Sequence, residues 1–128
     1  LEATGGELNV SGGWASTQMI EGLDRGVDAF MATILPDLYI KVHELHRMGD
    51  REGAFRAFNE LLPLLAFTRQ HADISIHFNK RMLYRQGIFE TPRVRQPILP
   101  FDSYHMKVAD ELIDYALSVS KPAKVQVL

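Results

Sequence analysis

The sequence contains no cysteine and no long apolar run, and its charges nearly balance. Without cysteine there are no disulfides, no thiolate metal sites and no cysteine nucleophiles. This composition is compatible with a cytoplasmic protein, which is our expectation. No apolar stretch reaches the roughly 18 residues that a membrane-spanning helix needs, so we expect no membrane contact. Fourteen basic residues against sixteen acidic ones leave a net charge of −2, which gives no field that favours nucleic acid.

The chain has 128 residues, of which 46% are hydrophobic, and this is the size of one ordinary domain. It begins Leu-Glu-Ala-Thr, with neither a starting Met nor a basic leader segment. We therefore expect a piece of a longer protein.

A single strand–helix–strand unit stands near the start of the chain. We predict strands at Leu8–Ser11 and Val27–Thr33, joined by a helix over residues 16–25 that Ser11 or Ser16 caps. Two strands joined by a crossover helix lie parallel, and a parallel sheet is covered on both faces. Because two strands do not make a stable sheet by themselves, we expect further strands from a larger α/β protein.

Only helices follow this unit. Glycine, proline and capping residues divide the rest of the chain into four predicted helices and one loop. The helices run from Pro36 to Gly49, from Asp50 through a kink at Pro63, from about Ala72 to Gly87, and from Asp102 to Lys121-Pro122, with the proline-rich loop Ile88–Asp102 before the last of them.

Three phrases together resemble the C-terminal portion of the dihydrodipicolinate synthase / N-acetylneuraminate lyase family. The first is Ser11-Gly12-Gly13, a helix, and then residues 26–31, Gly-Val-Asp-Ala-Phe-Met. The second is residues 61–64, Leu-Leu-Pro-Leu. The third is residues 78–87 followed by residues 92–97, Pro-Arg-Val-Arg-Gln-Pro. The resemblance covers residues 8–119 and rests on the order and spacing of these phrases.

The resemblance implies an α/β fold: the C-terminal part of a (β/α)8 TIM barrel, with two parallel strands and a crossover helix, plus a C-terminal helical segment. Residues 1–48 would be the last βαβα of the barrel and residues 49–128 the appended helices, so the chain alone would be mostly helical. A complete barrel needs about 250 residues.

Members of this family form a Schiff base between a lysine on the sixth strand and a 2-keto acid, usually pyruvate. A tyrosine on the fifth strand relays protons. Neither strand is present here. The resemblance therefore implies a carbon–carbon or carbon–oxygen lyase that acts on a pyruvate-like substrate as the intact protein, without a cofactor. By itself the chain would be inactive, and we expect it to form a homo-oligomer.

No lysine of the chain fits the Schiff-base role. Such a lysine must be desolvated at a strand end so that its pKa falls. We expect all five lysines on helices or in the tail: Lys41, Lys80, Lys107, Lys121 and Lys124. We accordingly assign no catalytic residue.

The candidate substrate wall consists of residues that follow the two strands. Barrel active sites lie at the carboxyl ends of the strands, and we place there the residues Gly12, Gly13, Trp14, Ala32 and Thr33. The glycines can equally serve only a tight turn, and the Thr33 hydroxyl can serve only the strand. Trp14 and Ala15 stand where the lyase branch has polar sugar-contacting residues, which favours a more apolar acceptor.

We interpret the remaining clusters of histidines and arginines as structural rather than functional. His43 and His46 have a spacing that can chelate a metal, but no further ligand pattern accompanies them, so we expect no metal site. We interpret Arg85, Arg93 and Arg95 as salt-bridge partners that fasten the proline-rich loop.

Two alternatives to the aldolase hypothesis remain. One is a non-enzymatic helical module for interaction or oligomerisation, whose strands form a ribbon or join a partner's sheet. The other is a phosphate-binding barrel of another family, which ranks lower because no further Gly-rich turn follows Thr33.

Overall fold

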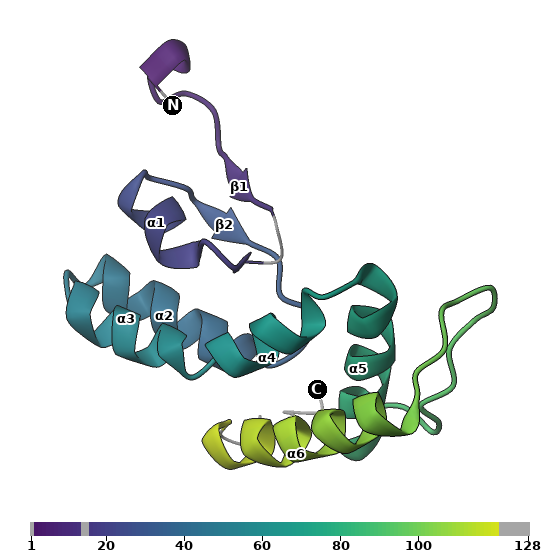
Figure 1. Cartoon of the computed structure of the whole chain (residues 1–128). Coiled ribbons are helices and arrows are strands. Elements are labelled where there is room, and N and C mark those ends of the chain that lie inside the picture. Colours follow the sequence, from purple (N-terminus) through teal and green to yellow (C-terminus); the bar gives the residue numbers. More distant parts are fainter. Residues whose placement is uncertain (1, 14–15, 121–128) are drawn as a thin grey trace, which may run out of the picture. The chain divides into compact units, whose positions relative to one another are not determined.

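The computed structural model describes residues 2–13 and 16–120, so Trp14, Ala15, Lys121, Lys124 and the predicted tail lie outside the described residues. The order of elements confirms a mostly helical chain with one small sheet (Figure 1). These elements are the 3-10 helix η1 (Glu2–Thr4), β1 (Ser11–Gly12), α1 (Met19–Asp24), β2 (Ala29–Phe30), α2 (Pro36–Arg47), α3 (Arg51–Asn59), α4 (Leu62–Thr68), α5 (Ala72–Arg85) and α6 (Ser103–Val119).

The chain divides into two compact units, Leu1–Leu61 and Leu62–Leu128. This division differs from the predicted boundary after residue 48. The predicted boundary separates the expected barrel portion from the appended helices, whereas the observed one separates two compact units. That boundary stays a prediction.

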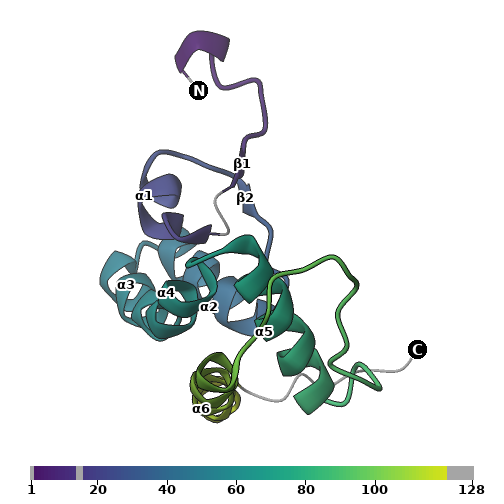
Figure 2. The ribbon, with the colours of Figure 1, turned by 45° about the vertical axis from the view of Figure 1, so that its right-hand side comes forward.

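The two strands pair in parallel, as predicted (Figure 2). Ser11 lies opposite Ala29, and Gly12 lies opposite Phe30. Asp28 extends the contact: its N–H donates to the Val10 carbonyl at 2.9 Å, and its carboxylate accepts from the Val10 N–H at 2.9 Å. The strands are shorter than predicted, since each contributes only two residues to the ladder and has no further neighbour among the described strands.

The first helix starts later than predicted. Neither Ser11 nor Ser16 caps it; Gln18 precedes α1 and makes no side-chain cap bond. Ser16 instead adopts a left-handed φ of 66°, and its side chain is buried with no hydrogen-bond partner among the described residues. A left-handed residue cannot itself form part of a right-handed helix, so Ser16 lies outside α1.

Three helices end in the same local arrangement. Gly26, Gly49 and Gly87 adopt φ values of 81°, 85° and 73° just after α1, α2 and α5. Each glycine N–H donates to the carbonyl three residues back, and the next N–H donates to the carbonyl five residues back. This is the Schellman motif, and all three helix ends match the prediction.

The first unit is built around the antiparallel pair α2 and α3, against which α1 also packs. Pro36 occupies the first turn of α2, and Asp50 caps α3 by accepting from the Gly53 N–H at 2.8 Å. Both were predicted. The buried side chains of these two helices are Leu38, Val42, Ala54, Ala57 and Phe58.

The predicted kink at Pro63 is wrong, because the helix breaks there. α3 ends at Asn59 and α4 begins at Leu62. Pro63 has no N–H to offer the Asn59 carbonyl, and its ring would clash with that carbonyl in a continuous helix.

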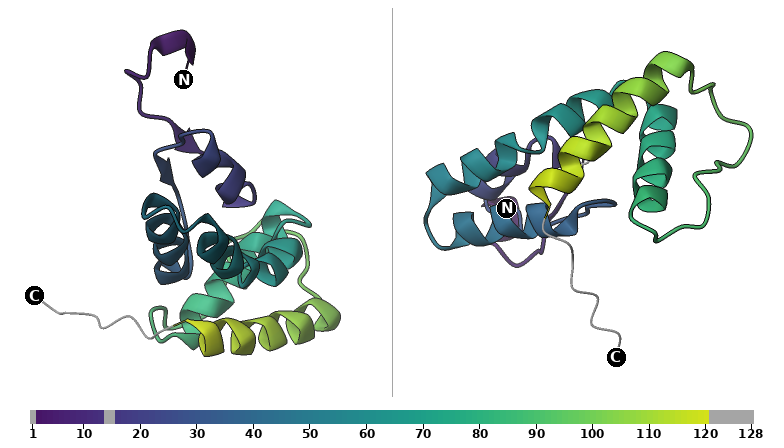
Figure 3. Two further views of the ribbon diagram at one scale, coloured as in Figure 1. Left: turned by 90° about the vertical axis from the view of Figure 1, so that its left-hand side faces the viewer. Right: turned by 90° about the horizontal axis from the view of Figure 1, so that it is seen from below.

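The second unit consists of α4, α5 and α6. Its core includes Leu64, Leu65, Phe67, Ile74, Phe78, Met82, Ala109, Ile113 and Ala116. Arg81 of α5 makes a bidentate pair with Asp110 of α6 at 2.6 and 2.7 Å. The loop between the two helices makes a long excursion (Figure 3), and α6 begins where Asp102 accepts from the His105 N–H at 2.8 Å. The predicted end of this helix at Lys121-Pro122 lies outside the described residues.

No helix in the described ranges has both the length and the apolar character that crossing a membrane requires.

Candidate functional site

Gly12 lies against an aromatic ring. A Cβ placed on Gly12 would overlap the Phe30 ring from the paired strand, and a Cβ on Gly22 of α1 would lie 2.7 Å from the Cζ of Phe30. The ring therefore fills the space that both glycines leave open. Close packing explains Gly12 without a ligand.

Gly13 is in a different situation. It is exposed, a Cβ there would meet nothing within 4 Å, and its φ lies outside the left-handed region. Neither packing nor backbone geometry in the described structure requires glycine at this position. An unhindered backbone at a strand end is what the close approach of a substrate or of another chain segment would use.

A pocket of about 380 Å³ opens beside this strand end. Gly12, Gly13 and Phe30 line one part. Glu21 of α1 and Arg25, which directly follows α1, line another. The two charged side chains pair with each other at 2.8 Å, so the pocket offers no unpaired cation for an anionic substrate.

Ala32 and Thr33 follow β2 before α2 begins. Ala32 is half-buried and Thr33 is exposed. Because the strands are parallel, their carboxyl ends share one edge, and Gly12, Gly13, Ala32 and Thr33 all follow or end a strand at that edge. Trp14, the fifth predicted wall residue, lies outside the described residues. The assignment of these five residues to a substrate stays a prediction.

The three described lysines lie on helices, as predicted. Lys41 is on α2, Lys80 on α5 and Lys107 on α6. The Lys41 ammonium is 3.9 Å from a Glu60 carboxylate oxygen, and the Lys80 ammonium is 5.4 Å from the centre of the Phe89 ring. None of the three is at a strand end.

His46 takes part in an ion-pair cluster. Its Nε2 lies 2.9 Å from the Asp24 carboxylate, which also accepts from the Arg51 guanidinium at 2.6 Å. The bonds from Arg51, and then the bond from His46, lower the pKa of Asp24 to about 2. Within residues 2–13 and 16–120, no group of three or more His, Cys, Asp or Glu side chains is arranged to hold a metal.

The predicted role of the arginines is wrong in part. Arg85 pairs with Asp114 and Asp110 of α6, at 2.6 and 3.6 Å, and so joins two helices rather than fastening the loop. Arg93 and Arg95 have no carboxylate partner in the described part of the chain. The loop is held instead through Leu99.

Leu99 is bound from two sides. Its N–H donates to the Asp73 carboxylate at 2.9 Å, and its carbonyl accepts from His77 Nε2 at 2.9 Å. Both partners belong to α5. Leu99 is 22 residues from His77 and 26 residues from Asp73 in the sequence. No local sequence pattern predicts bonds over such separations.

Comparison with known proteins gives one informative likeness. No family model matches the chain, and no curated protein matches it. A crystal structure of dihydrodipicolinate synthase from Rhodopseudomonas palustris is similar to it with a TM-score of 0.71 and 22% sequence identity. The match covers 79% of this chain and 34% of that chain, so this chain spans about a third of that protein's length. The chain therefore has a fold like that of about a third of dihydrodipicolinate synthase.

Proposed function

We propose that this chain is the C-terminal portion of a pyruvate-dependent class I aldolase or lyase like dihydrodipicolinate synthase. In the intact protein, a 2-keto acid would form a Schiff base on a lysine that residues 1–128 do not contain. The fold likeness over 79% of the chain is the observation that carries this proposal.

The surroundings of the sheet support a role in completing a TIM barrel. β1 and β2 have only each other as neighbours among the described strands, and the apolar side chains Leu8 and Met31 near them are 59% and 84% exposed. Parallel sheets are normally covered on both faces. In this proposal the remaining strands and helices of the barrel cover these side chains.

The strand ends would supply part of the substrate wall. Gly12, Gly13, Trp14, Ala32 and Thr33 follow or end the two strands, where barrel enzymes place their sites. The small residues among them, Gly12, Gly13, Ala32 and Thr33, would leave room for the substrate, while the reacting lysine and its proton relay would come from the rest of the protein.

Trapping with pyruvate and borohydride tests the proposal. Borohydride reduces a Schiff base to a stable adduct that mass spectrometry locates. We expect no adduct on the 128-residue chain, and an adduct on the intact protein at a lysine outside these residues, lost when that lysine is replaced by arginine.

Two outcomes would contradict the proposal. An adduct on any of the five lysines of this chain would place the chemistry here. An intact protein that forms no adduct would leave the chain as a helical interaction module, and a stable, monodisperse monomer of the isolated chain would point the same way.

A further inference from the structure

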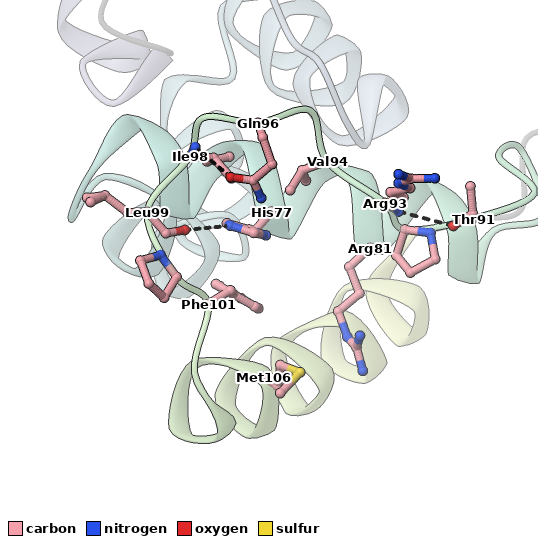
Figure 4. Close-up of a pocket in the computed structure, with 12 residues that line it drawn as sticks. His77, Arg81, Thr91, Arg93, Val94, Gln96, Ile98, Leu99, Phe101 and Met106 are labelled. Atoms are coloured by element: carbon pink, nitrogen blue, oxygen red, sulfur yellow. Dashed lines mark hydrogen bonds between the residues drawn. The ribbon is translucent and has the colours of Figure 1, made fainter.

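A second pocket, of about 650 Å³, lies within the second unit. Its walls come from α5, from the loop of residues 88–102 and from the first turns of α6 (Figure 4). Pockets that bury small ligands typically enclose about 300–1,000 Å³. The volume is large enough for a small organic molecule.

One wall is apolar and firmly held. Val94, Ile98, Phe101 and Met106 line it. The Phe101 ring stacks on the His77 ring at 4.7 Å between centres and on the His105 ring at 5.4 Å. Phe67 touches the edge of Phe101 from the core, at 6.4 Å. These three ring contacts hold the Phe101 ring in its orientation.

Most polar side chains around the pocket are already bonded. Thr91 accepts from the Arg93 N–H and Gln96 accepts from the Ile98 N–H, both at 3.2 Å. His77 donates to the Leu99 carbonyl, and Arg81 pairs with Asp110. The bonds of Thr91, Gln96 and His77 hold the loop, and the pair with Asp110 neutralises the charge of Arg81.

The guanidinium of Arg93 is the exception. Arg93 is exposed and lines the pocket, and its guanidinium has no carboxylate partner among the described residues. A neighbouring pocket of about 700 Å³ shares Arg93 and adds Lys80 and Arg95. No aspartate or glutamate lines either pocket. A mostly apolar pocket with an unpaired cation is complementary to an anion that carries an apolar group.

We propose that this pocket binds a small organic carboxylate with an aromatic or branched aliphatic body. The carboxylate pairs with the Arg93 guanidinium, whose planar fork matches two carboxylate oxygens. The apolar body lies against Val94, Ile98 and Phe101. This site lies in a different unit from the candidate substrate wall and does not depend on the proposed aldolase chemistry.

Titration of the isotope-labelled chain, followed by amide chemical shifts, tests the proposal with three probes. Benzoate has both the ring and the charge, benzamide has the ring without the charge, and acetate has the charge without the ring. We expect saturable shifts with benzoate at the non-proline residues between 91 and 101. Binding of the other two probes should be at least about tenfold weaker, the loss of one charge-assisted hydrogen bond or of one buried ring.

Two variants and a matched control make the test specific. Arg93→Gln removes the cation, and Val94→Glu puts a negative charge on the pocket wall; both should weaken benzoate binding at least about tenfold. Arg69→Gln removes an equal charge at an exposed position of the same unit that does not line the pocket. It should bind benzoate like the unaltered chain.

Three results would overturn the proposal: benzamide binding as tightly as benzoate, equal losses in Arg93→Gln and Arg69→Gln, or no saturable shift. An unchanged amide spectrum in the absence of probe shows that each variant is folded. Failure of this test leaves the pyruvate trapping result unaffected. The trapping experiment concerns a lysine outside this chain, whereas the titration concerns Arg93.

Discussion

Gly12 and Gly13 are adjacent, yet different surroundings act on them. The Phe30 ring occupies the space beside Gly12, whereas the space beside Gly13 is open. The same residue type thus serves packing at one position and leaves the backbone accessible at the next.

Alanine substitutions should separate these two roles. Gly12→Ala forces the Phe30 ring to move and should lower the free energy of unfolding by about 1–3 kcal/mol, as overpacking does. Gly13→Ala meets no atom and needs no left-handed backbone, so it should leave stability unchanged or raise it by about 0.4–1 kcal/mol. Urea unfolding followed by circular dichroism measures both, and equal effects would contradict the assignment.

Asp24 should make the stability of the first unit depend on pH. Its folded-state pKa of about 2 lies below the ordinary value of 3.8, so the folded state favours the charged carboxylate. The stabilisation is therefore fully present above about pH 4 and is lost as the pH falls through the folded pKa.

The comparison of the unaltered chain with Asp24→Asn measures this effect. We expect the variant to melt at a lower temperature at pH 6, and the difference to shrink as the pH falls from about 4 and to vanish below about pH 2. Glu44→Gln, at an exposed position of α2 with no ion pair among the described residues, is the control for loss of a carboxylate in the same unit. A difference between the unaltered chain and Asp24→Asn that is independent of pH would exclude the ion-pair explanation.

At the scale of elements, α5 contributes the central side chain of the second unit. Phe78 is fully buried and its ring lies 5.7 Å from that of Phe67. Ile76 lies two residues away on the same helix and is 44% exposed. The helix thus presents a buried face and a partly solvated one.

Phe78→Ala should cost about 3–5 kcal/mol, because it removes a buried ring and leaves a cavity. Ile76→Ala, on the same helix, should change stability by less than about 1 kcal/mol. Thermal and urea unfolding of both variants measure the contrast. Similar losses would mean that Ile76 is buried in solution.

Helix ends were predictable where the signal is local. Gly26, Gly49 and Gly87 end their helices, and Asp50 begins one, through bonds that span a few residues. The break at Pro63 was underestimated because the same proline allows either a kink or a new start, and tertiary packing decides between them.

The ion pairs were not predictable. Asp24 and Arg51 are 27 residues apart, and Arg81 and Asp110 are 29 residues apart. The sequence contains many acids and bases, and only the packing of the helices selects these partners. The candidate substrate wall was predicted from the resemblance to a barrel family. Local physical chemistry could not predict it, because in that family the rest of the site comes from other strands of the barrel.

At the scale of the whole molecule, an exposed apolar residue beside a strand with an unpaired edge favours self-association. Met31 follows β2 directly and is 84% exposed. Strands with unpaired edges and apolar flanks promote association between chains.

Met31→Lys should therefore reduce self-association of the isolated chain. Met48→Lys is the matched control, because Met48 is 72% exposed in the same unit but lies at the end of α2, away from the sheet. Sedimentation velocity over a range of concentrations should show a larger monomer fraction for Met31→Lys only. Equal behaviour of the two variants would place the contact elsewhere.

The Schellman motifs after α1, α2 and α5 have a consequence for how the chain folds. Each stop signal is complete within six consecutive residues, so it forms without any distant partner. The C-terminal ends of these helices are therefore set by local bonds and do not depend on how the helices pack. A segment of this kind can join a larger assembly and keep the same helix ends.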